Sequence, residues 1–456
     1  RGGSMKLNKK TTVLVGLAFL SICAFWQMYD SLVPLILTNH FRLDETWSGA
    51  IMAADNVLAL FLLPLFGSFS DRVNTRLGKR MPFILLGTIG ACVLMNLLPW
   101  LANSYYAQPT PGYQIAFIVV LGLLLIAMGT YRSPAVALMP DVTPKPLRSK
   151  GNAVINLMGA IGGLLYLGAA ALLYSKAREP QYTLGYVDGK TPVLDYRLLF
   201  GVVSGIMVVS VAVLVLTIRE NRLSRKNEAY EAAHPEENYA AVDSQGKEVL
   251  PGPVKRSLGF LLVSIALWYI GYNGVTTWFT TYISRVMGEG IGGASTCLLV
   301  ATGGAIVSYI PIGMVASRIG RRKTILAGAA LLAACFFVGF LVTANATAIT
   351  PPMYLIFVLV GLAWAAINVN SLPMVVEMCQ GSQVGKFTGY YYTFSMAAQV
   401  VTPIVAGWLL KNVSYKVLFP YAAFFVACSF VTMLFVRHGD NRVDAKRGLE
   451  AYDLPD

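Results

Sequence analysis

Long apolar stretches separated by short polar segments make up most of the chain. Most of them have about 20 residues or more, enough for an α-helix to cross a hydrocarbon layer of about 30 Å. We therefore expect an all-α membrane protein with twelve transmembrane helices. The pattern places them at residues 11–37, 46–69, 82–101, 113–138, 150–174, 196–218, 257–284, 293–316, 324–343, 352–376, 386–410 and 416–436.

One long polar segment interrupts this pattern in the middle of the chain. Residues 219–256 contain several basic, acidic and proline residues, so we expect a cytoplasmic linker there. The linker would join an N-terminal six-helix bundle, residues 1–218, to a C-terminal six-helix bundle with a cytoplasmic tail, residues 257–456. Within it, Glu220–Ala233 fits a surface helix.

The composition excludes several other classes of protein. Of 456 residues, 56% are hydrophobic and only 13% are charged, whereas a soluble protein has about 25% charged residues. The six cysteines lie in or beside apolar stretches and the three histidines are scattered, so no metal site is expected. Motifs of membrane hydrolases are absent, and Leu184 replaces the first glycine of a phosphate loop ending at Thr191. We therefore expect that the protein is not an enzyme and binds no cofactor.

The basic residues indicate the orientation in the membrane. With both termini in the cytoplasm, cytoplasmic segments hold 27 of the 36 lysines and arginines, as the positive-inside rule requires. The net charge of +13 then reflects contact with a lipid bilayer and does not call for nucleic acid. We expect a monomeric, multi-pass protein of the cell membrane.

Two parts of the chain repeat the same pattern. Gly67-Ser-Phe-Ser-Asp71-Arg72 follows the second span and Gly313-Met-Val-Ala-Ser317-Arg318 follows the eighth, and both lead into basic clusters. A duplicated six-helix unit, giving two pseudo-symmetric halves, explains this repeat. Glycines in the fifth span are expected to let it pack closely against a neighbour; they are Gly159, Gly162 and Gly163.

The loop after the second span carries a family signature. Gly67-x-x-x-Asp71-Arg72-x(5)-Gly78-Lys79-Arg80 resembles the loop 2–3 motif of the major facilitator superfamily. The longer stretch 70–84 is similar to the sucrose-carrier form of that loop and to the related glycoside–pentoside–hexuronide cation symporters. The stretches 131–141 and 150–156 are also similar to sucrose carriers.

This resemblance implies the major facilitator fold and secondary active transport of a sugar, a di- or oligosaccharide or a glycoside, by alternating access. Ala59 and Leu63 stand where melibiose-type sodium symporters have two aspartates. We therefore expect symport with a proton, and sodium is the less favoured ion. Three alternatives remain open: a sugar uniporter, a proton-coupled drug antiporter of the same fold, and a non-transporting membrane sugar receptor.

Ionisable residues inside the spans are few, and such residues usually have a function or a partner. Asp30 and Asp55 lie at similar depth in the first two spans, so we assign them to proton coupling. Two close carboxylates can share a proton. Arg132, the only basic residue inside a span, offers five fixed donors and is assigned to the substrate cavity.

A sugar site needs amides for its hydroxyl groups and aromatic rings for its C–H faces. Such residues recur at helical spacing in the spans, although interhelical packing is as good an explanation for any one of them. The predicted substrate-binding set is Arg132, Gln27, Asn56, Asn152, Asn156, Tyr272, Asn273, Trp364, Asn368, Tyr391 and Gln399.

Charged residues at the inner ends of the spans suggest a gate. Asp141 closes the fourth span beside the first basic loop, and Glu377 closes the tenth beside the second. We expect Asp141 to pair with Arg72, Arg76 or Arg80, and Glu377 with Arg318 or Arg322, so that the inner gate is held shut. The predicted gate latch comprises Asp71, Arg72, Arg80, Asp141, Arg318 and Glu377.

Overall fold

The structure is a computed structural model that describes residues 7–143, 148–233, 252–378 and 384–439, and helices dominate it. The first half contains α1 (Lys9–Val15), α2 (Leu17–Leu35), the π-helix η1 (Ile36–His40), α3 (Glu45–Arg72), α4 (Met81–Ala107), α5 (Pro111–Val142), α6 (Arg148–Leu173), the 3-10 helix η3 (Glu179–Gln181) and α7 (Arg197–Thr217). The second half contains α9 (Gly252–Met287), α10 (Ile291–Ile319), α11 (Arg321–Thr343), α12 (Pro351–Glu377), α13 (Val384–Asn412), the 3-10 helix η6 (Tyr415–Val417) and α14 (Leu418–Met433).

Twelve helical segments of the described chain are long and apolar enough to cross a membrane. Each falls on one of the ranges expected from the apolar pattern, which confirms a multi-pass, all-α membrane protein. The first span is built from α1, α2 and η1, because Gly16 separates two helices that continue in the same direction.

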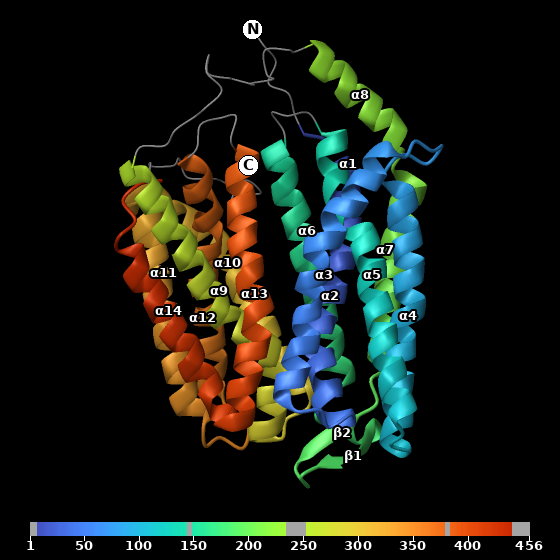
Figure 1. Cartoon of the computed structure of the whole chain (residues 1–456), viewed down its shortest axis with the longest axis vertical. Helices are drawn as coiled ribbons and strands as arrows, with labels where there is room; N and C mark the ends of the chain where they lie inside the picture. Colours follow the sequence, from blue (N-terminus) through green and yellow to red (C-terminus); the bar gives the residue numbers. More distant parts are fainter. Residues whose placement is uncertain (1–6, 144–147, 234–251, 379–383, 440–456) are drawn as a thin grey trace.

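Two elements outside the spans define the ends of the molecule. Helix α8 (Glu220–Ala233) confirms the surface helix expected in the linker. A hairpin of β1 (Thr183–Val187) and β2 (Thr191–Leu194) was not expected. Figure 1 shows α8 at one end of the helix bundle and the hairpin at the other, so we call these the linker end and the hairpin end.

The two halves have separate hydrophobic cores and stand side by side (Figure 1). They meet where α3 packs along α13, α6 along α10 and α2 along α9. Within the first half, α6 approaches α2 closely. A Cβ atom on Gly162 would lie 2.2 Å from the carbonyl oxygen of Leu20, and one on Gly159 would lie 2.5 Å from the ring of Phe19. The expected close packing is confirmed at these two glycines.

Polar contacts between the halves gather at the hairpin end. The Thr280 hydroxyl group donates to the carbonyl oxygen of Ser31 at 2.7 Å. At the start of α3, Asp44 forms an ion pair with Lys411 at 3.0 Å. These bonds join residues far apart in sequence and hold the halves together at this end.

Candidate functional site

Three ionisable side chains from three helices of the first half form the centre of the candidate site. Asp30 comes from α2, Asp55 from α3 and Arg132 from α5, and each interacts electrostatically with at least one of the other two. The guanidinium carbon of Arg132 lies 5.4 Å from the centre of the Trp26 ring. Among the described residues, neither carboxylate is close enough to Arg132 for an ion pair. The guanidinium group is therefore not locked to a single partner.

Several polar side-chain atoms of the first half are buried without a hydrogen-bond partner in the described part of the chain. They are Asp55 Oδ1, Trp26 Nε1, Asn156 Nδ2 and the hydroxyl oxygen of Tyr29. Buried polar atoms without partners are rare, and each costs about 1–3 kcal/mol. A polar ligand that reached these atoms would recover that free energy.

Aromatic side chains dominate the candidate residues of the second half. The rings of Tyr272 on α9 and Trp364 on α12 are stacked, 3.8 Å apart and 5° from parallel. Tyr269 meets Trp364 edge to face at 5.4 Å, and its hydroxyl oxygen lies 3.2 Å from that of Tyr391 on α13. We call these four residues the aromatic cluster. The predicted substrate-binding set contains all of them except Tyr269.

One aromatic residue links the two halves of the site. Tyr392 on α13 interacts electrostatically with Arg132. Sequence reasoning missed Tyr392 because it selected only Tyr391 from three consecutive tyrosines. Neighbouring residues of a helix point in different directions, so Tyr391 joins the aromatic cluster while Tyr392 is exposed.

Amides of the predicted set have varied surroundings. The Asn56 side chain donates to the backbone oxygen of Gln399 at 3.4 Å, which joins α3 to α13. Gln27 faces Gly163 of α6. The side-chain oxygen of Asn273 lies 3.5 Å from its own neighbour in α9, Thr276.

Two further members of the set are only partly characterised. Asn368 is partly buried in α12, and its backbone oxygen accepts a hydrogen bond from Ser371. The side chain of Asn152 lies outside the described residues.

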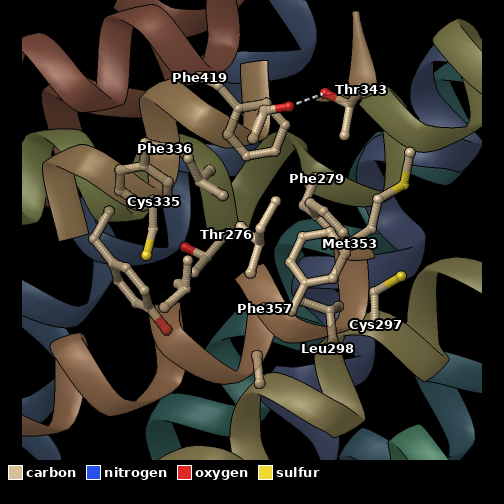
Figure 2. A pocket seen from close by; sticks show the side chains of 16 residues that line it. Thr276, Phe279, Cys297, Leu298, Cys335, Phe336, Thr343, Met353, Phe357 and Phe419 are labelled. Carbon is tan, nitrogen blue, oxygen red and sulfur yellow. Dashed lines mark hydrogen bonds between the residues drawn. The ribbon is translucent and has the colours of Figure 1, made fainter. Parts of the chain in front are cut away.

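An enclosed cavity lies inside the second half, apart from these charges. Helices α9 to α12 and α14 form it, and Figure 2 shows Phe279, Phe357 and Phe419 among its walls. Its lining is almost entirely apolar, and its volume is about 50 Å³, room for only a few water-sized molecules. Tyr272 is the one member of the predicted set that lines it.

The family signature folds into a compact charged cluster at the linker end. Arg80 forms ion pairs with Asp71 at 2.6 Å and with Asp141 at 2.7 Å. Burial opposes the charge of Arg80, but hydrogen bonds to Asp141 and Asp71 raise its pKa. Of the three arginines considered for Asp141, Arg80 makes the bond. The cluster connects α3, α4 and α5 of the same half.

Helix α8 is fastened to this cluster by Glu220. The buried carboxylate of Glu220 accepts hydrogen bonds from the backbone N–H groups of Lys79, Arg80 and Met81, at 2.9 to 3.1 Å. These groups begin α4, where the helix dipole favours a negative charge. Burial nevertheless raises the pKa of Glu220, because the three hydrogen bonds, which lower the pKa, only partly offset the effect of burial. Gly78 has φ +125°, and a Cβ atom there would lie 2.2 Å from the Glu220 carboxylate.

The remaining predicted gate residues are Arg72, Arg318 and Glu377. Arg72 and Arg318 are exposed at the linker end. The side chain of Glu377 lies outside the described residues. Arg322, considered as a partner of Glu377, donates to the carbonyl oxygen of Leu434 at 2.9 Å.

Comparison with known proteins places these features in a family. A family model described as "Major Facilitator Superfamily" matches residues 15–310 and 289–451. The sucrose transport protein SUC3 of Arabidopsis thaliana is 28% identical over 159 residues, which are 32% of this chain and 26% of that protein. Solute carrier family 45 member 3 of Homo sapiens is 28% identical over 200 residues, 42% of this chain and 33% of that protein. The chain thus matches only a quarter to a third of the length of these relatives.

Solved structures resemble the whole chain. An inward-open structure of the xylose transporter XylE from E. coli matches with a TM-score of 0.64, covering 96% of this chain and 97% of that one at 14% identity. A bacterial homologue of the iron transporter ferroportin matches with a TM-score of 0.66, covering 94% and 99% at 12% identity. At such low identity, the likeness shows the fold alone.

Proposed function

Because the chain belongs to the major facilitator superfamily, we propose that it is a secondary transporter that carries a sugar together with a proton by alternating access. The family and the fold are those of transporters. The observation that carries the proposal is the centre of the site, where Asp30, Asp55 and Arg132 interact on three membrane-spanning helices.

The charges of this centre favour a single cation as the coupling ion. Two carboxylates and one guanidinium group give a net charge of −1 when all three are ionised. A net charge in the bilayer costs several kcal/mol, so binding one proton makes the group neutral and lets it move with the protein. Asp55 has a buried carboxylate oxygen without a partner, so we assign the proton to Asp55, with Asp30 as the second carboxylate.

The rest of the site suits a sugar. Arg132 and the unpartnered atoms of Trp26 and Asn156 supply hydrogen-bond donors in the first half. The aromatic cluster supplies flat apolar faces in the second half, where the C–H faces of a sugar ring can pack. The names of the matched plant relatives refer to sucrose, so we propose sucrose or a similar glycoside as the substrate.

The orientation follows from the basic residues. We propose that the linker end faces the cytoplasm of a cell membrane, because cytoplasmic segments then carry most of the lysines and arginines. The hairpin end then faces outward, and the polar bonds gathered there correspond to a state closed to the outside. Nothing in this mechanism requires a second copy of the chain, so we propose a monomer.

Uptake of labelled sucrose by the full chain in proteoliposomes tests this function. A single proton crossing 100 mV supplies about 2.3 kcal/mol, or roughly a fiftyfold gradient. We expect accumulation that needs a proton gradient and is abolished by a protonophore. Equilibration without accumulation would instead indicate a uniporter. Sugar binding without uptake would indicate a receptor, and proton-driven movement of drugs but not sugars would indicate an antiporter.

A further inference from the structure

The β-hairpin that sequence reasoning missed grows out of the first half but touches the second. Three residues, 188–190, connect β1 to β2. Asp188 and Gly189 both have positive φ, 57° and 68°, and the Lys190 N–H group donates to the carbonyl oxygen of Val187 at 3.2 Å, which closes a tight turn. Val193 and Leu194 of β2 are buried, and Leu194 belongs to the hydrophobic core of the first half. The ring of Tyr182, just before β1, stacks on Tyr174 at 4.4 Å. The base of the hairpin is therefore part of the first half.

The tip of the hairpin binds the end of α9 in the second half. The Lys190 ammonium group donates to the backbone oxygen of Val286, and the Thr191 hydroxyl group donates to that of Ser284 at 3.4 Å. Thr191 is buried in this contact. Helix α9 is the helix that also packs along α2 of the first half.

Arg285 joins the tip to a third element. Its guanidinium group forms an ion pair with Asp188 in the hairpin turn at 3.1 Å. A second nitrogen of the same group donates to the carbonyl oxygen of Thr38 at 3.0 Å, in the π-helix that ends the first span. The Arg285 side chain is only 17% exposed. One arginine of the second half thus binds two separate segments of the first.

A second set of bonds between the halves lies at the same open pit. Lys411 pairs with Asp44, and the Tyr415 hydroxyl group bonds to the carboxylate of Glu45. Lys190, Arg285, Lys411 and Tyr415 all line this pit. All of these bonds join the first half to the second, so all of them would break if the halves separated at this end.

We propose that the hairpin is a strap that stabilises the conformation closed at the hairpin end, with Arg285 as the residue that fastens it. The strap must release Arg285, Val286 and Ser284 before the hairpin end can open. This inference rests on the alternating access of the proposed function. It also explains why the connection between α6 and α7 is folded, since a disordered loop could not hold the end of α9 in place.

Accessibility of a cysteine at position 280 tests the strap. Thr280 is buried, and its hydroxyl group contacts the first half across the α2–α9 contact. In a Thr280→Cys background, a membrane-impermeant maleimide added from the hairpin side reports opening; labelling of the same chain without this cysteine is subtracted. We expect Arg285→Met to raise the labelling rate about fivefold, the effect of losing one partly exposed ion pair with its hydrogen bond.

Arg197→Met is the matched control. Arg197 lies at the same end and pairs with Asp195 at 2.7 Å, but both residues belong to the first half. We expect its labelling rate to stay at the level of the background protein. An equal rise in this control, or no rise in Arg285→Met, would overturn the strap.

A double variant that exchanges the charges of Asp188 and Arg285 tests the ion pair even if a single variant misfolds. Asp188→Arg combined with Arg285→Asp recreates the ion pair without the bond to Thr38. We expect slower labelling than in Arg285→Asp alone, and equal rates would contradict the role of the pair. Because this assay uses neither sugar nor a proton gradient, its result is independent of whether the chain accumulates sucrose.

Discussion

Replacement of Asp55 by asparagine should separate coupling from sugar movement. Asparagine keeps the size of the side chain but cannot exchange a proton, and the net charge of the central group changes from −1 to zero. The driving force of one proton at 100 mV, about 2.3 kcal/mol, is then lost. We expect the accumulation ratio of sucrose to fall from a ceiling of roughly fiftyfold to about one.

The assay measures net sucrose uptake and sucrose exchange in the same proteoliposomes. A potassium diffusion potential drives net uptake of labelled sucrose, whereas exchange of labelled for unlabelled sucrose needs no net proton movement. We expect Asp55→Asn to lose net uptake and to retain exchange. Asp195→Asn is the control, because Asp195 is a carboxylate at the hairpin end whose partner, Arg197, belongs to the same half; we expect it to keep accumulation. Wild-type accumulation in Asp55→Asn would remove this residue from the coupling mechanism.

Three further outcomes follow from contacts in the described chain. Arg132→Ala should weaken sucrose binding about 10- to 100-fold, the loss of a charge-assisted hydrogen bond, and titration calorimetry measures it. Gly78→Ala should lower the melting temperature, because an alanine with φ +125° costs about 1–3 kcal/mol and its Cβ would displace Glu220. Asp141→Asn should destabilise the protein more than Asp71→Asn, because the Asp141 side chain is 31% exposed and that of Asp71 is 64% exposed.

Matched controls exist for the first two of these variants. Arg256 lies over the ring of Phe260 at 5.6 Å, a cation–π contact like that of Arg132, but outside the central group. Arg256→Ala should leave sucrose affinity unchanged. Gly259 lies inside α9 with open space around it, so Gly259→Ala should not lower the melting temperature. A loss of sucrose affinity in Arg256→Ala would contradict the role of Arg132. A loss of stability in Gly259→Ala equal to that in Gly78→Ala would contradict the role of Gly78.

The sequence predicted the features of this fold that depend on local pattern. Hydropathy over about 20 residues locates a span without knowledge of its neighbours, and all twelve spans were found in this way. The central trio was selected by the cost of ionisable groups in the bilayer. That Asp30, Asp55 and Arg132 interact follows from how α2, α3 and α5 pack, which the sequence alone does not give.

Features that depend on distant partners could not be predicted. Glu220 binds the start of α4 from about 140 positions away, and no local pattern links the two. Arg285 binds both Thr38 and Asp188, and no local pattern links it to either residue. The hairpin itself had a local signal. Asp188-Gly189 between stretches rich in threonine, tyrosine and valine is typical of a tight β-turn.

The two ends of the molecule are held in different ways, and this difference has a mechanical consequence. At the hairpin end, Arg285 and Lys411 bind across the two halves. At the linker end, Arg80 and Glu220 bind segments that move with the first half. If the halves rotate as rigid bodies, bonds of the first kind break and bonds of the second kind survive. Substitutions at the hairpin end should therefore shift the balance between conformations, whereas Asp141→Asn should lower stability in both.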